Sequence, residues 1–196
     1  MLSNKKSDIE KYLDPLIRSL SELNPNYLTL IGSIPSLLFF VFVISHQYVW
    51  AIVAFLGNIF DFLDGMVARK YHKVTQFGGF LDSTLDRVAD FFIIAAFGYG
   101  KIVRWEIVVP LLFVSFLISY IRSRGELASG NKILFNVGII ERTERLVLVI
   151  FSLLLYMITP AVLFNNLNLA EWVFLVLIAL SCYTIAQRVA HAYKKL

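Results

Sequence analysis

Five aspartates lie within a stretch of thirty residues, in or at the ends of two apolar runs: Asp61, Asp64, Asp82, Asp86 and Asp90. An aspartate at the centre of a membrane helix costs about 2.5 to 3.5 kcal/mol on insertion scales, so the first four could together cost on the order of 10 kcal/mol without compensation. Hard carboxylate oxygens suit magnesium or manganese. We therefore expect bound divalent cations to offset these charges.

The spacing of four of these acids supports a shared metal site. In helices, Asp61 and Asp64 fall on one face at positions i and i+3, and Asp82 and Asp86 share a face at i and i+4. Two such pairs that face each other would form a cage of four carboxylates. The sequence therefore predicts a metal-binding cage between two helices.

Buried ion pairs are an alternative role for the same acids, because helix bundles often contain them. Asp90 fits this interpretation, since Arg87 lies three residues before it. Arg69 is another possible cation for the remaining acids. Ion pairing alone does not explain why two carboxylates share a face on each of two helices.

The segments that must position the acids have the composition of membrane helices. Hydrophobic residues make up 58% of the 196-residue chain and charged residues 16%, whereas a typical soluble domain has about 25% charged residues. About 20 apolar residues cross a hydrocarbon core, and six runs approach that length, the fourth being short and expected to extend further. The runs cover residues 27–44, 48–68, 80–99, 107–121, 139–158 and 169–190. We predict an all-α integral membrane protein with six transmembrane helices.

The N-terminal residues have a different pattern. Between residues 9 and 23, apolar side chains recur at spacings of three and four, with charged residues between them. This pattern is typical of an amphipathic helix that lies on the membrane surface. No long linker follows, so we predict a single domain over residues 1–196, with a juxtamembrane helix in 1–24 and the six-helix bundle in 25–196.

Basic residues are distributed unequally between the two sets of connections. One set holds most of them, including Arg69, Arg142 and Lys194, whereas the opposite connections hold only Lys101 and Arg104. The positive-inside rule then places both termini and the acidic segment on the cytoplasmic side of the cell membrane. We expect a multi-pass protein whose active site faces the cytoplasm.

The acids also belong to a longer motif. It reads Asp61-Phe-Leu-Asp64-Gly65-Met-Val-Ala68-Arg69, eight residues, Gly78, three residues, Asp82, three residues, Asp86. This motif resembles the signature of the CDP-alcohol phosphatidyltransferase family. At about one chance in fifteen per residue, eight matches would arise about once in 10⁹ trials. The resemblance extends over essentially the whole chain.

The resemblance implies a homodimeric enzyme that moves a lipid phosphate group from a CDP-activated lipid to an alcohol and releases CMP. Two divalent cations, Mg²⁺ or Mn²⁺, would bind to Asp61, Asp64, Asp82 and Asp86, and Asp86 would also be the general base. Its partners would be its substrates and membrane lipids, with no nucleic acid. The CDP-lipid would contact Asp64, Gly65, Ala68, Arg69, Thr75, Gly78 and Asp82.

The acceptor alcohol depends on residues outside this motif. The strings 119–126 and 138–145 resemble the branch of the family that uses inositol phosphate and makes phosphatidylinositol phosphate or its archaeal counterpart. A phosphate dianion needs a cluster of cations. The resemblance implies that this cluster consists of Arg122, Arg142, Arg145 and Arg188, although a lysine is familiar at the first of these positions.

Several alternatives stay open at this point. Arg122 could serve only as an anchor at the cytoplasmic surface, and Arg145 could pair with Glu141, four residues before it. Glycerol 3-phosphate is the alternative acceptor, because it also needs a basic pocket. A cation transporter is a more remote alternative, since the acids cluster toward one end of their helices. The sequence does not distinguish CDP-diacylglycerol from CDP-archaeol.

Overall fold

The computed structural model describes residues 25–58, 70–71, 75–130, 132–162 and 165–196. The helices in these ranges are α2 (Pro25–Gly32), α3 (Ile34–Ile44), α4 (Tyr48–Leu56), α6 (Gln76–Tyr99), α7 (Trp105–Ala128), α8 (Arg142–Ile158) and α9 (Leu169–Lys195). All regular elements of the described ranges are helical, which confirms the predicted all-α class. The predicted amphipathic helix in 1–24 lies outside the described residues.

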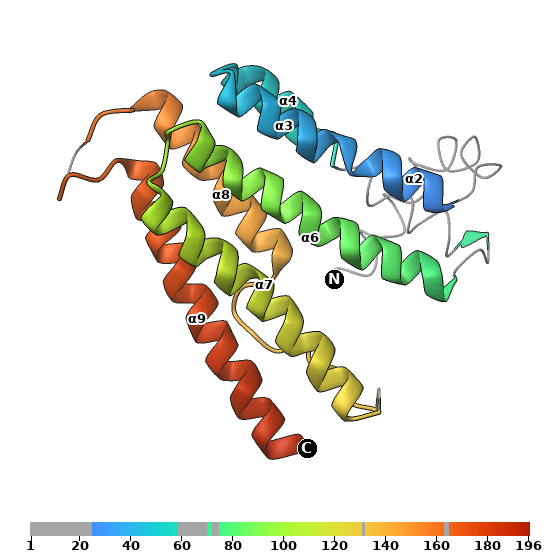
Figure 1. Cartoon of the computed structure of the whole chain (residues 1–196). Coiled ribbons are helices and arrows are strands. Elements are labelled where there is room, and N and C mark those ends of the chain that lie inside the picture. The colour runs from blue at the N-terminus through green and yellow to red at the C-terminus, as the bar shows by residue number, and fades with distance from the viewer. Residues whose placement is uncertain (1–24, 59–69, 72–74, 131, 163–164) are drawn as a thin grey trace, which may run out of the picture.

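Successive long helices run in alternating directions. Figure 1 shows the turns between α3 and α4, between α6 and α7 and between α8 and α9 at one end of the bundle. The beginnings of α6 and α8 and the ends of α7 and α9 lie toward the other end. Helix α6 packs between α3 and α7, and α9 packs against α7 and α8. This order brings the first turns of α6 and α8 toward the same end.

Side-chain caps define where three of the helices begin. The Thr75 hydroxyl caps α6, while capping boxes begin α8 with Glu141 and Glu144 and begin α9 with Asn168 and Glu171. Caps of this kind satisfy the backbone N–H groups that a first helical turn leaves without partners. Two of these caps therefore fix the starting points of α6 and α8, the helices that carry most of the predicted site residues within the described ranges.

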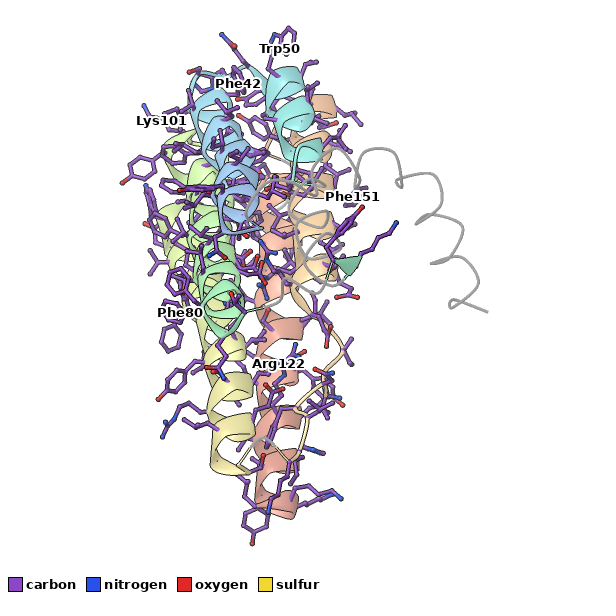
Figure 2. All side chains as sticks on the ribbon, turned by 90° about the vertical axis from the view of Figure 1, so that its right-hand side faces the viewer. Phe42, Trp50, Phe80, Lys101, Arg122 and Phe151 are labelled. Carbon is purple, nitrogen blue, oxygen red and sulfur yellow. The ribbon has the colours of Figure 1, made fainter. Side chains whose placement is uncertain are left out.

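The core is apolar, and so is much of the outer surface. Phe97 of α6 packs against Phe174 of α9 with ring centroids 4.9 Å apart, and both are fully buried. On the outside, Trp50, Phe80 and Phe151 are 59%, 66% and 47% exposed, and Figure 2 shows them on the periphery of the bundle. Large apolar patches are unusual on monomeric soluble proteins. This surface suits a bundle surrounded by lipid.

Three helical segments of the described residues are long and apolar enough to cross a membrane: Asn26–Ile44, Trp105–Ala128 and Leu169–Lys195. The second of them extends beyond the short fourth run at both ends, as expected. Helix α8 has 17 residues and starts at Arg142, and α6 contains charged residues in its first half. That six helices span the membrane stays a prediction.

Candidate active site

Three acids lie along one face of α6. Asp82, Asp86 and Asp90 are four residues apart on this helix, which places their side chains one above another. The Asp82 residue is half-buried, the Asp86 side chain is 18% exposed, and the Asp90 side chain is 6% exposed. The acidic face therefore runs from the accessible beginning of α6 into the interior of the bundle.

The first turn of α6 brings two predicted CDP-lipid contacts together. The backbone N–H of Gly78 donates a hydrogen bond to the Thr75 hydroxyl at 2.9 Å. A Cβ atom at Gly78 would lie 3.0 Å from that hydroxyl oxygen and 3.2 Å from Oδ1 of Asn26, so a side chain would crowd both. The N-terminus of a helix attracts phosphate through its N–H groups. This turn is therefore a candidate site for a diphosphate group.

Arg142, the first residue of α8, binds two acids of α6. Its Nη1 atom lies 2.5 Å from Oδ1 of Asp86, and its Nε donates to Oδ1 of Asp90 at 3.0 Å. The Arg142 side chain is 30% exposed. Such charge-assisted bonds are stronger than neutral ones. They connect the beginning of α8 to the acidic face of α6.

Arg145 lies deeper and binds the other oxygen of Asp90. Its Nη2 donates to Oδ2 of Asp90 at 2.6 Å, and its side chain is 1% exposed. The alternative that paired Arg145 with Glu141 is not what the structure shows, since the Glu141 side chain caps α8. The guanidinium group of Arg145 is therefore a buried partner of α6. Its predicted contact with the acceptor stays a prediction.

Asp90 takes part in a buried ion pair, as one interpretation of the sequence proposed, but Arg87 is the wrong partner. The Arg87 guanidinium binds its neighbour Asp86 at 3.2 Å. Asp90 binds across helices to residues that follow it by 52 and 55 positions. Local spacing carries no information about such distant partners. The available signal was that Asp90 continues the i, i+4 series of Asp82 and Asp86.

The other two predicted acceptor residues differ in exposure. Arg122 on α7 is 41% exposed and binds Glu126 at 3.2 Å. Arg188 on α9 is buried, and it donates to the backbone oxygens of Val137 at 2.8 Å and Ile118 at 2.7 Å. Arg188 thus ties the α7–α8 connection to two helices, whereas Arg122 is accessible.

A cavity of about 950 Å³ lies between α6 and α7. Asp86 and Arg122 line it together, and Phe91 and Phe116 contribute apolar surface. Ligand sites are commonly concave, mostly apolar and furnished with a few polar groups. The cavity therefore brings a predicted catalytic acid and a predicted acceptor residue to the same accessible space.

The predicted metal cage is only partly within the described residues. Asp82 and Asp86 are described, and they offer hard oxygen ligands one helical turn apart. Within the described ranges, no group of three or more His, Cys, Asp or Glu side chains is placed to hold a metal ion. Five other predicted site residues lie outside these ranges, so the complete cage stays a prediction: Asp61, Asp64, Gly65, Ala68 and Arg69.

Comparison with known proteins gives a consistent set of matches. Residues 22–185 match the sequence model of the CDP-alcohol phosphatidyltransferase family. The chain is 37% identical to archaetidylinositol phosphate synthase of Pyrococcus horikoshii, over 100% of this chain and 98% of that protein. It is 34% identical to phosphatidylinositol phosphate synthase of Mycobacteroides abscessus, over 71% of this chain and 67% of that protein.

Solved structures of similar fold come from Mycobacterium tuberculosis. The crystal structure of its phosphatidylinositol phosphate synthase (PgsA1) with CDP-DAG bound aligns with a TM-score of 0.77 at 25% identity, covering 91% of this chain and 92% of that one. The structure of the same synthase with manganese and citrate aligns with a TM-score of 0.76 at 26% identity, covering 91% and 88%.

Proposed function

The chain belongs to the CDP-alcohol phosphatidyltransferase family, whose members are membrane-bound enzymes of phospholipid biosynthesis, and from this premise we propose that inositol phosphate is its acceptor. The enzyme would transfer a lipid phosphate group from a CDP-lipid to inositol phosphate and release CMP. The observation that carries the proposal is the position of Arg142. A partly exposed guanidinium group lies 2.5 Å from the predicted base, Asp86.

Two divalent cations, Mg²⁺ or Mn²⁺, fit the acidic residues of this chain. Asp82 and Asp86 supply carboxylates one turn apart on α6, and Asp61 and Asp64 would supply the facing pair. When bound, such ions neutralise the diphosphate and stabilise the charge that develops on the attacking and leaving oxygens. The M. tuberculosis synthase has been crystallised in complex with manganese, which supports this choice of metal.

In the proposed reaction, Asp86 accepts the proton of the acceptor hydroxyl. The hydroxyl oxygen then forms a bond to the lipid-bearing phosphorus, and the bond from that phosphorus to the CMP oxygen breaks. The leaving CMP takes the bonding electron pair. The Asp86 side chain suits this role because it is 18% exposed and lines the cavity between α6 and α7.

The CDP part of the lipid would bind at the beginning of α6. The turn capped by the Thr75 hydroxyl leaves little room for a side chain at Gly78, and the N-terminus of a helix favours a phosphate group. Residues 64–69 of the motif would complete this site. The M. tuberculosis synthase, crystallised with CDP-DAG, supports a CDP-lipid as the donor.

The phosphate of the acceptor would bind to Arg122 and Arg142, the two predicted acceptor residues whose side chains are partly exposed. Arg142 also begins α8, where the helix dipole favours an anion. Arg145 and Arg188 are buried and would support this site from within the bundle. The P. horikoshii and M. abscessus relatives are synthases of inositol phospholipids, which supports inositol phosphate over glycerol 3-phosphate.

The experiment that tests this function measures CMP release by the purified enzyme in detergent with Mg²⁺. Parallel reactions would contain inositol phosphate, glycerol 3-phosphate or no acceptor, each with CDP-archaeol or CDP-diacylglycerol. We expect release with inositol phosphate and a labelled inositol phospholipid as product. Turnover with glycerol 3-phosphate but not with inositol phosphate would contradict the proposed acceptor.

We further propose that the enzyme is a homodimer in the cell membrane with both termini in the cytoplasm. Basic residues at the ends of α7 and α9 support this orientation, because the opposite connections carry only Lys101 and Arg104. Mass photometry in detergent would test the homodimer. Labelling of single cysteines placed at each terminus would test the orientation.

A further inference from the structure

Asp90 connects three parts of the proposed site although it belongs to none of the predicted ligand sets. One carboxylate oxygen accepts from Nε of Arg142 at 3.0 Å, and the other accepts from Nη2 of Arg145 at 2.6 Å. Arg142 in turn reaches Asp86, one turn earlier on α6. The Asp90 side chain is 6% exposed, so water screens its two ion pairs only weakly.

The deeper pair anchors Asp90. Among the described residues, Nε and Nη1 of Arg145 have no hydrogen-bond partner, so its guanidinium group is held by Asp90 through Nη2. A buried guanidinium group without a counter-charge is strongly unfavourable. Asp90 therefore stabilises the bundle by neutralising Arg145. The same ion pair holds the Asp90 carboxylate in place and so fixes the position of its other oxygen, Oδ1.

The ion pair nearer the surface joins Oδ1 of Asp90 to Arg142 and orients this partly exposed arginine. Arg142 binds α6 through two different nitrogens, Nε toward Asp90 and Nη1 toward Asp86. Because the guanidinium group is planar and its donors form a rigid fork, two contacts on one helix define the plane and direction of the group. The contact with Asp90 therefore restricts the rotation of the group beyond what the contact with Asp86 does.

We infer that Asp90 is a positioning residue for the acceptor. It holds Arg142 so that the guanidinium group meets the acceptor's phosphate at a fixed distance from the base Asp86. The inference rests on the proposed function in one respect, namely that Arg142 binds that phosphate. In reactions that depend on orientation, a displacement of about 1 Å can cost about 10²-fold in rate, so the geometry of this contact matters.

The first test compares two substitutions of Asp90. Asp90→Asn removes the charge that holds both arginines, and we expect it to lower the Tm and, by weakening the contact between Arg142 and the phosphate, to raise the KM for inositol phosphate by about 10- to 100-fold. Asp90→Glu keeps the charge but moves it outward by one methylene group. We expect its Tm to stay near that of the wild type while the KM for the acceptor still rises by about 10-fold.

In both variants the KM for the CDP-lipid should stay within about twofold of the wild-type value, because no CDP contact is altered. Glu171→Gln is the matched control. Glu171 on α9 is also a buried acid, 4% exposed, and it binds Arg104, the residue just before α7, at 2.8 Å. We expect this control to lower the Tm and to leave both KM values unchanged.

The second test is a double-mutant cycle with Arg142→Gln. If Asp90 acts through Arg142, adding Asp90→Asn to Arg142→Gln should change the KM for the acceptor by no more than about twofold. If the acceptor KM of the double variant instead rises by the product of the two single-variant factors, the inference is wrong. An unchanged acceptor KM in Asp90→Glu, or equal changes in both KM values, would also overturn it and leave Asp90 with only a structural function.

These outcomes can be separated from failure of the proposed function. The wild-type enzyme is assayed first, and the variants are then measured with whichever phosphorylated alcohol it uses. If that acceptor is glycerol 3-phosphate, the proposed acceptor is wrong, but Asp90 is still tested. If Arg142→Gln changes no acceptor KM, the phosphate contact fails and the inference about Asp90 fails with it.

Discussion

The two ends of the bundle each contain a buried acid that binds an arginine from another helix or connection. At the end with the three turns, Glu171 of α9 binds Nε of Arg104 at 2.8 Å and its backbone N at 3.2 Å. Its other oxygen accepts from the backbone N of Asn168 at 2.9 Å. Among the described residues, this acid has one charged partner, and backbone donors complete its hydrogen bonds.

At the opposite end, charges are shared between several residues. Asp86 and Asp90 both bind Arg142, Asp90 also binds Arg145, and Arg87 binds Asp86. Two donors of Arg145 are buried without a hydrogen-bond partner in the described part of the chain. Buried polar networks stabilise a fold best when every member is satisfied.

We interpret this difference as one between an ion pair that stabilises the fold and a cluster that serves the proposed reaction. The Arg104–Glu171 pair closes a junction with few charges and complete hydrogen bonds. The cluster around Asp86 gathers several charges on α6 and α8 and leaves two buried donors of Arg145 without a hydrogen-bond partner among the described residues. Ionisable groups gathered in a cleft are candidates for a functional site, and this contrast can be tested at each end separately.

Removal of divalent cations should have the largest effect and should act on one end only. We expect excess EDTA to abolish CMP release, because the carboxylates of the motif would repel one another and the diphosphate would keep its full charge. Addition of Mg²⁺ or Mn²⁺ should restore the activity. Undiminished turnover in EDTA, with no metal detected by mass spectrometry, would disprove the metal cage.

Asp86→Asn should have the next largest effect. An amide keeps the shape of the carboxylate but does not accept the acceptor's proton, so we expect kcat to fall by about 10²- to 10⁴-fold. Binding of the CDP-lipid, measured by isothermal titration in detergent, should persist. A variant that turns over at nearly the wild-type rate would show that Asp86 is neither the base nor an important metal ligand.

Arg142→Gln should have an intermediate effect on a single substrate. Loss of one charge-assisted contact to a phosphate costs about 1.5 to 3 kcal/mol, which corresponds to an increase of about 10- to 150-fold in the KM for inositol phosphate. The KM for the CDP-lipid should stay nearly unchanged. Equal effects on both substrates, or a large loss of Tm, would place Arg142 with the structural pair at the other end.

Much of this fold could be predicted from apolar runs, but the starts of helices depend on local chemistry. The fifth run was predicted to begin at residue 139, whereas α8 begins at Arg142. Gly138 has φ +144°, and a side chain there would clash with Thr184, whose hydroxyl also accepts from the backbone N of Ile140 at 3.2 Å. Ile140 is buried as part of a connection, which hydropathy alone does not reveal.

The sequence predicted residues of the candidate site, but it did not predict which of them bind one another. The i, i+4 spacing of Asp82 and Asp86 correctly placed both on one face of α6. The partners of Asp90 could not be predicted, because they come from a helix more than fifty residues away. Likewise, the resemblance grouped Arg188 with the cations around the acceptor's phosphate, and it carried no information about the backbone oxygens that its guanidinium group binds inside the bundle.

Glu171→Gln should have the smallest effect on catalysis, and it tests the other side of the comparison. The amide oxygen can still accept one of the hydrogen bonds, but the charge that binds Arg104 is lost. Arg104 is 52% exposed, so water screens part of this interaction and can solvate the arginine afterwards. We therefore expect a loss of about 1 kcal/mol or somewhat more in stability, which lowers the Tm by about 2 to 10 °C, as followed by thermal unfolding in detergent. Below that Tm, kcat and both KM values should equal those of the wild type. A change in either KM would show that the two ends are coupled through α9, and the distinction between a structural pair and a reactive cluster would then not hold.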